Sequence, residues 1–148
     1  MEQAQVLTFL NNKDRDLLLQ FCGYSTTEPL HSFGPAVRPH YIIHFILNGK
    51  GIFQIREKTY HLETGQGFLI EPDELTFYQS DSQEPWEYLW IGFNGKMIPE
   101  FLKQIGLSSA HPIFHCDKKK ELYWLVNDML VHSKSNFSSD LRRTGLLY

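Results

Sequence analysis

Imidazole, phenol, indole and guanidinium groups recur along one stretch of the chain, at positions that alternate with apolar residues. In an extended strand, residues of like parity lie on one face, so His40 shares a face with His44, and Tyr88 shares a face with Trp90. These groups suit a sugar-like ligand, because aromatic rings stack on its C–H face and polar side chains bond its hydroxyls. The candidate ligand-binding residues are Arg38, His40, His44, Tyr78, Tyr88 and Trp90.

Each of these aromatic residues, taken singly, is also explained as part of an ordinary core. The set of Tyr78, Tyr88 and Trp90 favours a pocket, because three polar-tipped aromatic rings are an inefficient way to fill an inert interior. Arg38, just before the strand that carries His44, would add a fixed fork of donors. The pattern therefore predicts a sensing pocket.

No constellation in the chain requires an enzyme. His40 and His44 would lie about 13 Å apart along an extended strand, too far to share a metal ion without a bulge. The acidic residues between positions 57 and 74 fall in or near turns, where a solvated role is the default, and no Gly-x-Ser-x-Gly element is present. We expect no catalytic residue, no metal and no cofactor.

Seven or eight short strands between residues 17 and 95 must position these side chains. Glycine-rich turns at 48–51 and 63–67 separate alternating segments, which is typical of a small antiparallel barrel or double sheet. A first strand is expected from Leu17 to Cys22, ending at Gly23. Residues 1–16 read as a loose arm, and residues 25–39 as a loop with at most one short strand.

After Gly95 the apolar residues recur at helical spacing. We expect one helix over 97–105 with Gly106 at its C-cap, a second from Asp117 to about Val131, and a third from Ser138 or Ser139. The third pattern stops at Tyr148 without a cap, so we expect more protein to follow. The predicted dimerisation residues are Leu122, Leu125, Val126, Met129, Leu141 and Tyr148. The alternative is that these faces only pack against the barrel.

The length, net charge and cysteine content of the chain restrict the class of protein further. The 148 residues suit one domain, and a formal net charge of −3 with a pI of about 6.1 argues against a nucleic-acid surface. Cys22 and Cys116 match no metal or redox spacing, and no signal peptide or membrane-spanning run is seen. We expect a cytoplasmic protein that does not associate with membranes.

Three segments, 44–51, 62–72 and 86–93, together with Tyr78, resemble the N-terminal effector-binding domain of AraC/XylS-type transcription regulators. The preceding segments 22–24 and 31–35, with Arg38, are similar to those of raffinose and multiple-sugar operon regulators of Gram-positive bacteria. The resemblance covers residues 17–148.

This resemblance implies a mainly β protein with C-terminal helices. Its cupin-like antiparallel β-barrel, of the double-stranded β-helix or jelly-roll kind, would be followed by two or three α-helices. It implies an arm over 1–16, a ligand-binding barrel over 17–95 and a helical dimerisation segment over 96–148. A small carbohydrate, with α-galactosides as one candidate, would stack on Trp90. The protein would be a homodimer that contacts DNA only through a helix-turn-helix domain absent from this chain.

Departures from the family pattern keep alternatives open. Tyr88 stands where the arabinose-responsive relative has an imidazole. Metal-binding cupins carry a His-x-His pair, whereas residues 41–43 interrupt that pair here, and Thr76 stands near their last histidine. The leading hypothesis is a non-enzymatic carbohydrate sensor. The alternatives are a small cupin enzyme, such as a metal-dependent sugar isomerase or oxygenase, and a barrel that only dimerises.

Overall fold

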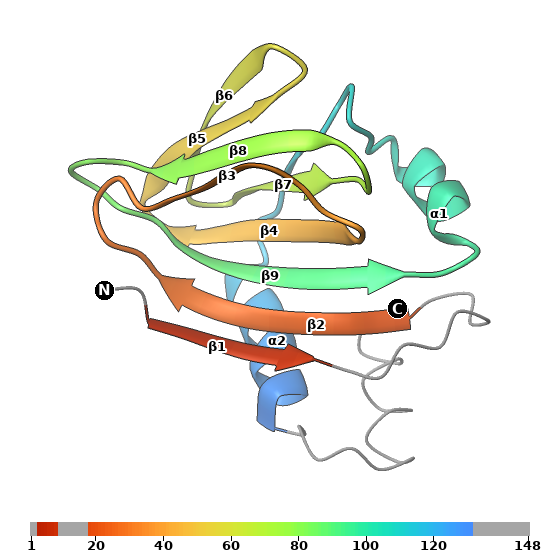
Figure 1. The fold of residues 1–148 in the computed structure, drawn as a ribbon. Coiled ribbons are helices and arrows are strands. Elements are labelled where there is room, and N and C mark those ends of the chain that lie inside the picture. The colour runs from red at the N-terminus through yellow and green to blue at the C-terminus, as the bar shows by residue number, and fades with distance from the viewer. Residues whose placement is uncertain (1–2, 9–17, 132–148) are drawn as a thin grey trace.

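The chain forms two facing β-sheets with helices outside them, as the computed structural model shows for residues 3–8 and 18–131 (Figure 1). Sheet A contains, in spatial order, β1 (Gln3–Thr8), β2 (Leu18–Thr26), β9 (Glu87–Asn94), β4 (Tyr41–Asn48), β7 (Gln66–Ile70) and β10 (Ile113–His115). Sheet B contains β3 (Ser32–Val37), β8 (Leu75–Ser80), β5 (Lys50–Ile55) and β6 (Lys58–Glu63). The prediction of a mainly β chain with C-terminal helices is confirmed.

All strand pairs are antiparallel, and their register brings distant residues together. Between β4 and β9, His44 lies opposite Trp90. Between β5 and β8, Phe53 lies opposite Tyr78. Since alternate residues of a strand point to opposite faces, this register decides which side chains meet between the two sheets.

Residue type explains the conformation of some turns but not of others. Gly49, between β4 and β5, has a φ of 81°, and a Cβ there would lie 2.4 Å from the Pro85 carbonyl oxygen. Only glycine fits that turn. By contrast, Arg56 and Glu57 join β5 to β6 with φ values of 49° and 64°, although neither Arg nor Glu is typical of a left-handed turn.

Three strand assignments differ from the expectations. β1 lies inside the stretch expected to be a loose arm, and it pairs with β2 along its whole length. β2 continues past Gly23 to Thr26, and β10 interrupts the segment expected to be helical by pairing with β7. In each case the open edge of a neighbouring strand supplies hydrogen-bond partners for the backbone. The local sequence pattern does not show which distant strand will be the neighbour.

The two helices were predicted closely. α1 (Ile98–Ile105) ends at Gly106, whose φ of 74° forms a left-handed C-cap. α2 (Lys119–Val131) begins two residues after Asp117. The expected third helix, with Leu141 and Tyr148, lies outside the described residues. No helix in the described part of the chain is long and apolar enough to cross a membrane.

Sheet A is buried on both faces. Its inner face packs against sheet B and forms one hydrophobic core with it. Its outer face packs against α1 and α2 and forms two further hydrophobic cores there. This double burial accounts for the near-continuous apolar run of β4, in which Ile42 and Ile46 face inward while Phe45 and Leu47 face the helices.

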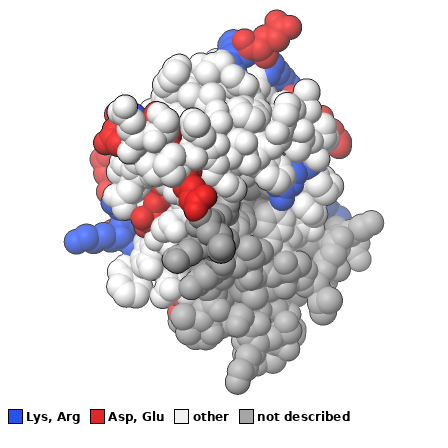
Figure 2. Space-filling view, turned by 60° about the vertical axis from the view of Figure 1, so that its left-hand side comes forward, with Lys and Arg blue, Asp and Glu red and all other residues white. Residues whose placement is uncertain are grey.

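Charged residues do not gather into one basic surface on the face shown in Figure 2. Acidic and basic side chains lie in small separate groups, some at its margin and some within it, and uncharged residues cover most of its described area. On this face, therefore, the described residues offer no footprint for the phosphates of a nucleic acid.

Candidate ligand-binding site

Four of the six predicted binding residues meet between the sheets. The His44 ring lies 4.8 Å from the Tyr78 ring and 5.1 Å from the Tyr88 ring, measured between centroids. Tyr88 in turn lies 5.6 Å from Trp90. These residues come from β4, β8 and β9, so the prediction that they share one face of a barrel agrees with the structure.

Arg38 and His40 lie at the end of the barrel where β4 begins. The Arg38 Cζ is 4.9 Å from the centroid of the Phe33 ring and 6.0 Å from that of Phe21. Phe21 also contacts His40 edge to face, at 5.4 Å. Arg38, His40 and Trp90 are all partly exposed, so they are the predicted residues that an incoming molecule can reach first. We call this end of the barrel the Arg38 end.

The deeper rings are packed rather than exposed to an open pocket. Tyr78 and Tyr88 are each 5% exposed and His44 is 3% exposed. Phe68 stacks on His44 at 4.6 Å and on Phe53 at 4.3 Å. The sequence analysis expected the two tyrosines to line a pocket, and the structure instead shows both as members of the aromatic core. A ligand at the Arg38 end reaches them only if this packing adjusts.

Several buried polar atoms of the barrel form no hydrogen bond with a described residue. Two of them belong to the histidines, His40 Nδ1 and His44 Nδ1, and the others are Trp86 Nε1 and Gln20 Oε1. An unsatisfied buried polar group costs about 1–3 kcal/mol, so such groups call for a partner. A ligand hydroxyl or a bound water would supply one.

Both histidines are held in the neutral form at pH 7. Burial, and after it the positive charge of Arg38, lower the pKa of His44 to about 3. The same two causes, in the same order, lower the pKa of His40. A neutral imidazole has one donor and one acceptor, which suits it to hydroxyl groups.

Three aromatic residues important to the site were not among the predicted binding residues. Phe68 and Trp86 lie within the inner core, and Phe21 covers Gly92, where a Cβ would lie only 2.2 Å from the Phe21 ring. Strand parity could have placed Phe68 beside Ile70 and Trp86 beside Tyr88. The position of Phe21 over Gly92 depends on the β2–β9 register, which no local signal sets.

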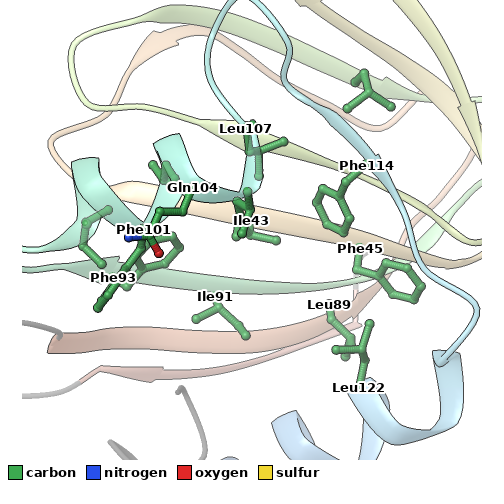
Figure 3. A pocket seen from close by; sticks show the side chains of 15 residues that line it. Ile43, Phe45, Leu89, Ile91, Phe93, Phe101, Gln104, Leu107, Phe114 and Leu122 are labelled. Carbon is green, nitrogen blue, oxygen red and sulfur yellow. The ribbon is translucent and has the colours of Figure 1, made fainter.

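A second concave feature lies on the opposite face of sheet A. It is a groove of about 720 Å³ between α1 and α2. The side chains of Phe45, Leu89, Phe114 and Leu122 point into it (Figure 3). Its lining is almost wholly apolar, so it lacks the hydrogen-bonding groups that would hold a sugar.

The predicted dimerisation residues separate into two groups in the structure. Leu122 packs against the core that contains Phe45 and Leu89, which favours the alternative of packing within one chain for this residue. Leu125 is exposed, and so is Trp124, at 63%. The side chains of Val126 and Met129, and all of Leu141 and Tyr148, lie outside the described residues.

Two antiparallel sheets closed around one aromatic interior, with helices following, define a cupin-like β-barrel. Solved structures of low identity share this fold. YhaK from Escherichia coli aligns with a TM-score of 0.59 at 12% identity, over 78% of this chain and 52% of its own. A Cupin 2 conserved barrel domain protein from Salinispora arenicola aligns with a TM-score of 0.51 at 14% identity, over 70% and 84% of the two chains. The predicted fold class is confirmed.

The chain belongs to the family of AraC-like ligand-binding domains, whose model matches residues 18–148. It is 45% identical to the Msm operon regulatory protein of Streptococcus mutans over 137 residues, covering 90% of this chain and 48% of that protein. It is 30% identical to the lactose operon transcription activator of Staphylococcus xylosus over 135 residues, covering 90% and 48%. The predicted resemblance to regulators of the AraC type is confirmed.

A third relative is also named as a regulator of a sugar operon. The raffinose operon transcriptional regulatory protein RafR of Pediococcus pentosaceus is 29% identical over 145 residues, covering 84% of this chain and 50% of that protein. The chain thus spans about half the length of the curated relatives it matches. These relatives are named as regulators of operons. Among the residues the structure describes, no group of three or more His, Cys, Asp or Glu side chains could hold a metal ion.

Proposed function

We propose that this chain is the effector-sensing and dimerisation domain of a bacterial transcription regulator, and that its barrel binds a small carbohydrate. The observation that carries the proposal is the set of unpartnered polar atoms, His44 Nδ1 above all, inside an aromatic barrel. The sugar ring would stack on Trp90, and Arg38, His40 and His44 would bond its hydroxyls. Tyr78 and Tyr88 would complete the pocket from beneath.

The names of the relatives support a sugar effector. The lactose and raffinose operon regulators are similar to this chain over most of its length, and raffinose carries an α-galactoside. An α-galactoside is therefore a sensible first member of a ligand panel. DNA contacts would belong to a further domain of the full-length regulator, and the cytoplasm is the compartment where such a regulator meets DNA.

A physical connection runs from the barrel to the second helix. Glu87, next to Tyr88 on β9, accepts a hydrogen bond of 2.5 Å from the Tyr24 hydroxyl on β2. Tyr24 in turn contacts the Tyr123 ring on α2, at 5.8 Å. A ligand that moves Tyr88 would thereby bias the position of α2, provided that it binds one arrangement more tightly than the other.

Replacing Trp90 with alanine is expected to weaken sugar binding about tenfold or more, because it removes the stacking surface, and to leave the protein folded. A thermal-shift screen against mono- and oligosaccharides identifies the ligand first, since a ligand that binds only the folded state raises its stability. Isothermal titration then compares the variants. Trp124→Ala, which truncates an exposed tryptophan on α2, is the matched control and should bind normally. Normal binding by Trp90→Ala would refute the pocket.

The same screen distinguishes the enzyme alternative. If no sugar raises the stability but a chelator lowers it, a metal-dependent cupin enzyme becomes the better interpretation. If neither has an effect, the barrel serves dimerisation or binds a ligand outside the panel.

The chain is expected to sediment as a dimer at concentrations on the order of tens of micromolar. Trp124 and Leu125 are exposed apolar side chains on α2, and in a dimer a second copy would cover them. Trp124→Glu combined with Leu125→Glu should shift the protein to monomer, whereas Lys103→Glu on α1 should not. A wild-type monomer at this concentration would count against the dimer.

A further inference from the structure

Trp86 is buried in the barrel with its indole N–H unpaired. The residue is 1% exposed, and its Nε1 forms no hydrogen bond with a described residue. An indole N–H can only donate a hydrogen bond, and a buried donor without an acceptor destabilises the folded chain. This N–H therefore needs an acceptor that the described residues do not supply.

The backbone of Trp86, in contrast, is fully paired, and its ring is held in place. The backbone N–H donates to Ser80 Oγ at 2.8 Å, and the carbonyl accepts from Thr27 Oγ1 at 2.6 Å. A Cβ at Gly51 would lie 2.5 Å from the Cε3 and Cζ3 atoms of the indole, so this edge of the ring rests on the Gly51 backbone. Nε1 lies on the opposite side of the indole. These contacts fix the direction in which the unpaired N–H points.

Trp86 and His44 border the same group of rings. Three rings, those of Phe68, Tyr78 and Tyr88, contact both residues. Their centroids lie 4.6, 4.8 and 5.1 Å from that of His44, and 6.0, 6.3 and 6.0 Å from that of Trp86. His44 Nδ1 also has no partner among the described residues. Two buried polar atoms that need partners thus lie around one aromatic cluster.

The chemistry of this cluster favours an uncharged acceptor. The buried polar residues of the described chain are Gln20, Ser25, His44, Thr76, Ser80 and Ser109. None of them carries a charge at pH 7, since burial, and after it the charge of Arg38, lower the pKa of His44 to about 3. An anion among these groups would be buried without a counter-charge, which is strongly unfavourable. A sugar hydroxyl is neutral, and its oxygen offers two lone pairs to donors such as the indole N–H.

We propose that Trp86 is a further ligand-binding residue, whose indole N–H donates to a neutral hydroxyl at the innermost part of the effector. This inference rests on the proposed function, since it adds a contact to the same barrel. Trp90 provides the stacking surface, whereas Trp86 and His44 select sugars that carry hydroxyls in matching positions. Because the rings around the two atoms are packed, binding requires that these rings move apart.

The indole N–H signals of the three tryptophans, Trp86, Trp90 and Trp124, test this contact in a 1H–15N correlation spectrum of the 148-residue chain. Trp90→Phe and Trp124→Phe each remove one signal from the ligand-free spectrum and thereby assign the third to Trp86. Isothermal titration shows which of galactose, lactose and raffinose binds. At saturation with that sugar, the Trp86 signal should move downfield and become less temperature-dependent, because its proton enters a hydrogen bond.

Sugars that lack one hydroxyl identify the group that Trp86 binds. Titration compares galactose with its 2-, 3-, 4- and 6-deoxy analogues. The analogue without the bound hydroxyl should bind about tenfold to a hundredfold more weakly and leave the Trp86 signal in its ligand-free position. Trp86→Phe should bind galactose and that analogue equally, since the donor is gone. Trp124→Phe, which changes an exposed ring on α2, is the control and should retain the difference.

The outcomes separate this inference from the proposed function. If a sugar binds and moves the Trp90 signal but not that of Trp86, then Trp86 is only a core residue, and the carbohydrate sensor stands without it. If the Trp86 signal of the ligand-free chain is already that of a hydrogen-bonded proton, its N–H has another partner, such as a buried water, and the inference fails. If Trp86→Phe does not fold, the wild-type spectra with galactose and its analogues decide. If no sugar binds, the inference and the proposed function fail together.

Discussion

Replacing Phe68 with alanine is expected to lower the free energy of unfolding by about 3–5 kcal/mol. Phe68 is almost fully buried, and its ring contacts Phe53, His44, Tyr78 and Trp86 at centroid distances between 4.3 and 6.0 Å. Three of these neighbours come from β4, β5 and β8 in both sheets, and Trp86 lies just before β9, so they cannot collapse together into the space that the ring leaves. The loss therefore combines transfer and cavity terms.

Urea unfolding followed by tryptophan fluorescence measures this loss, since Trp86 lies beside the substituted ring. Leu75→Ala is the control: Leu75 is also on a sheet strand but is 60% exposed, and its truncation should change the stability by less than about 0.5 kcal/mol. A loss below about 1 kcal/mol for Phe68→Ala would show that the aromatic interior is loosely packed. In that case a ligand could enter it without a large rearrangement.

Lowering the pH from 7.5 to 5 is expected to destabilise the wild type by about 2 kcal/mol through His44 alone. Its pKa is about 3 in the folded chain and about 6.5 when unfolded. Between these values the unfolded state binds the proton and the folded state does not. Stability is therefore full above pH 6.5 and falls as the pH drops toward 3.

The variant His44→Phe isolates this contribution, because a phenyl ring keeps the stacking on Phe68 but cannot titrate. Urea unfolding at pH 7.5 and pH 5 should show a smaller loss for His44→Phe than for the wild type. His111→Phe, which changes an exposed histidine, should behave like the wild type. Equal losses in His44→Phe and the wild type would mean that the His44 ring accepts a proton in the folded chain, which solvated or open packing would allow.

The two predictions concern the same stacked pair, and that pair is also the floor of the candidate site. A sugar reaches the partly exposed Arg38, His40 and Trp90 before it reaches His44, which is almost fully buried. The Nδ1 atom of His44 has no hydrogen-bond partner among the described residues, which favours binding of a ligand at that atom. The stacking of the His44 ring on Phe68 disfavours such binding, because the packed rings block access to it. The measured stability of the core bears directly on how deep the effector binds.

Strand parity in the sequence was enough to place His44, Tyr88 and Trp90 on one face and Phe45 and Leu89 on the other. Parity is a local property with a period of two residues, and each face follows from it once a strand is assigned. The same holds for α1, because its apolar period and Gly106 are neighbours in sequence. The composition of the site was therefore determined locally.

The tertiary structure decided how those residues meet. The stacking of Phe68 on His44 depends on the β4–β7 register, and the cover of Phe21 over Gly92 depends on β2 joining β9. The loose arm became β1 for the same reason, since β2 offered it an open edge. These pairings join residues far apart in the chain, and only the packing of the whole barrel selects one register among several that satisfy the local pattern. That packing turned an expected pocket lined by tyrosines into a filled aromatic core, in which Arg38, His40 and Trp90 are the partly exposed members of the predicted site.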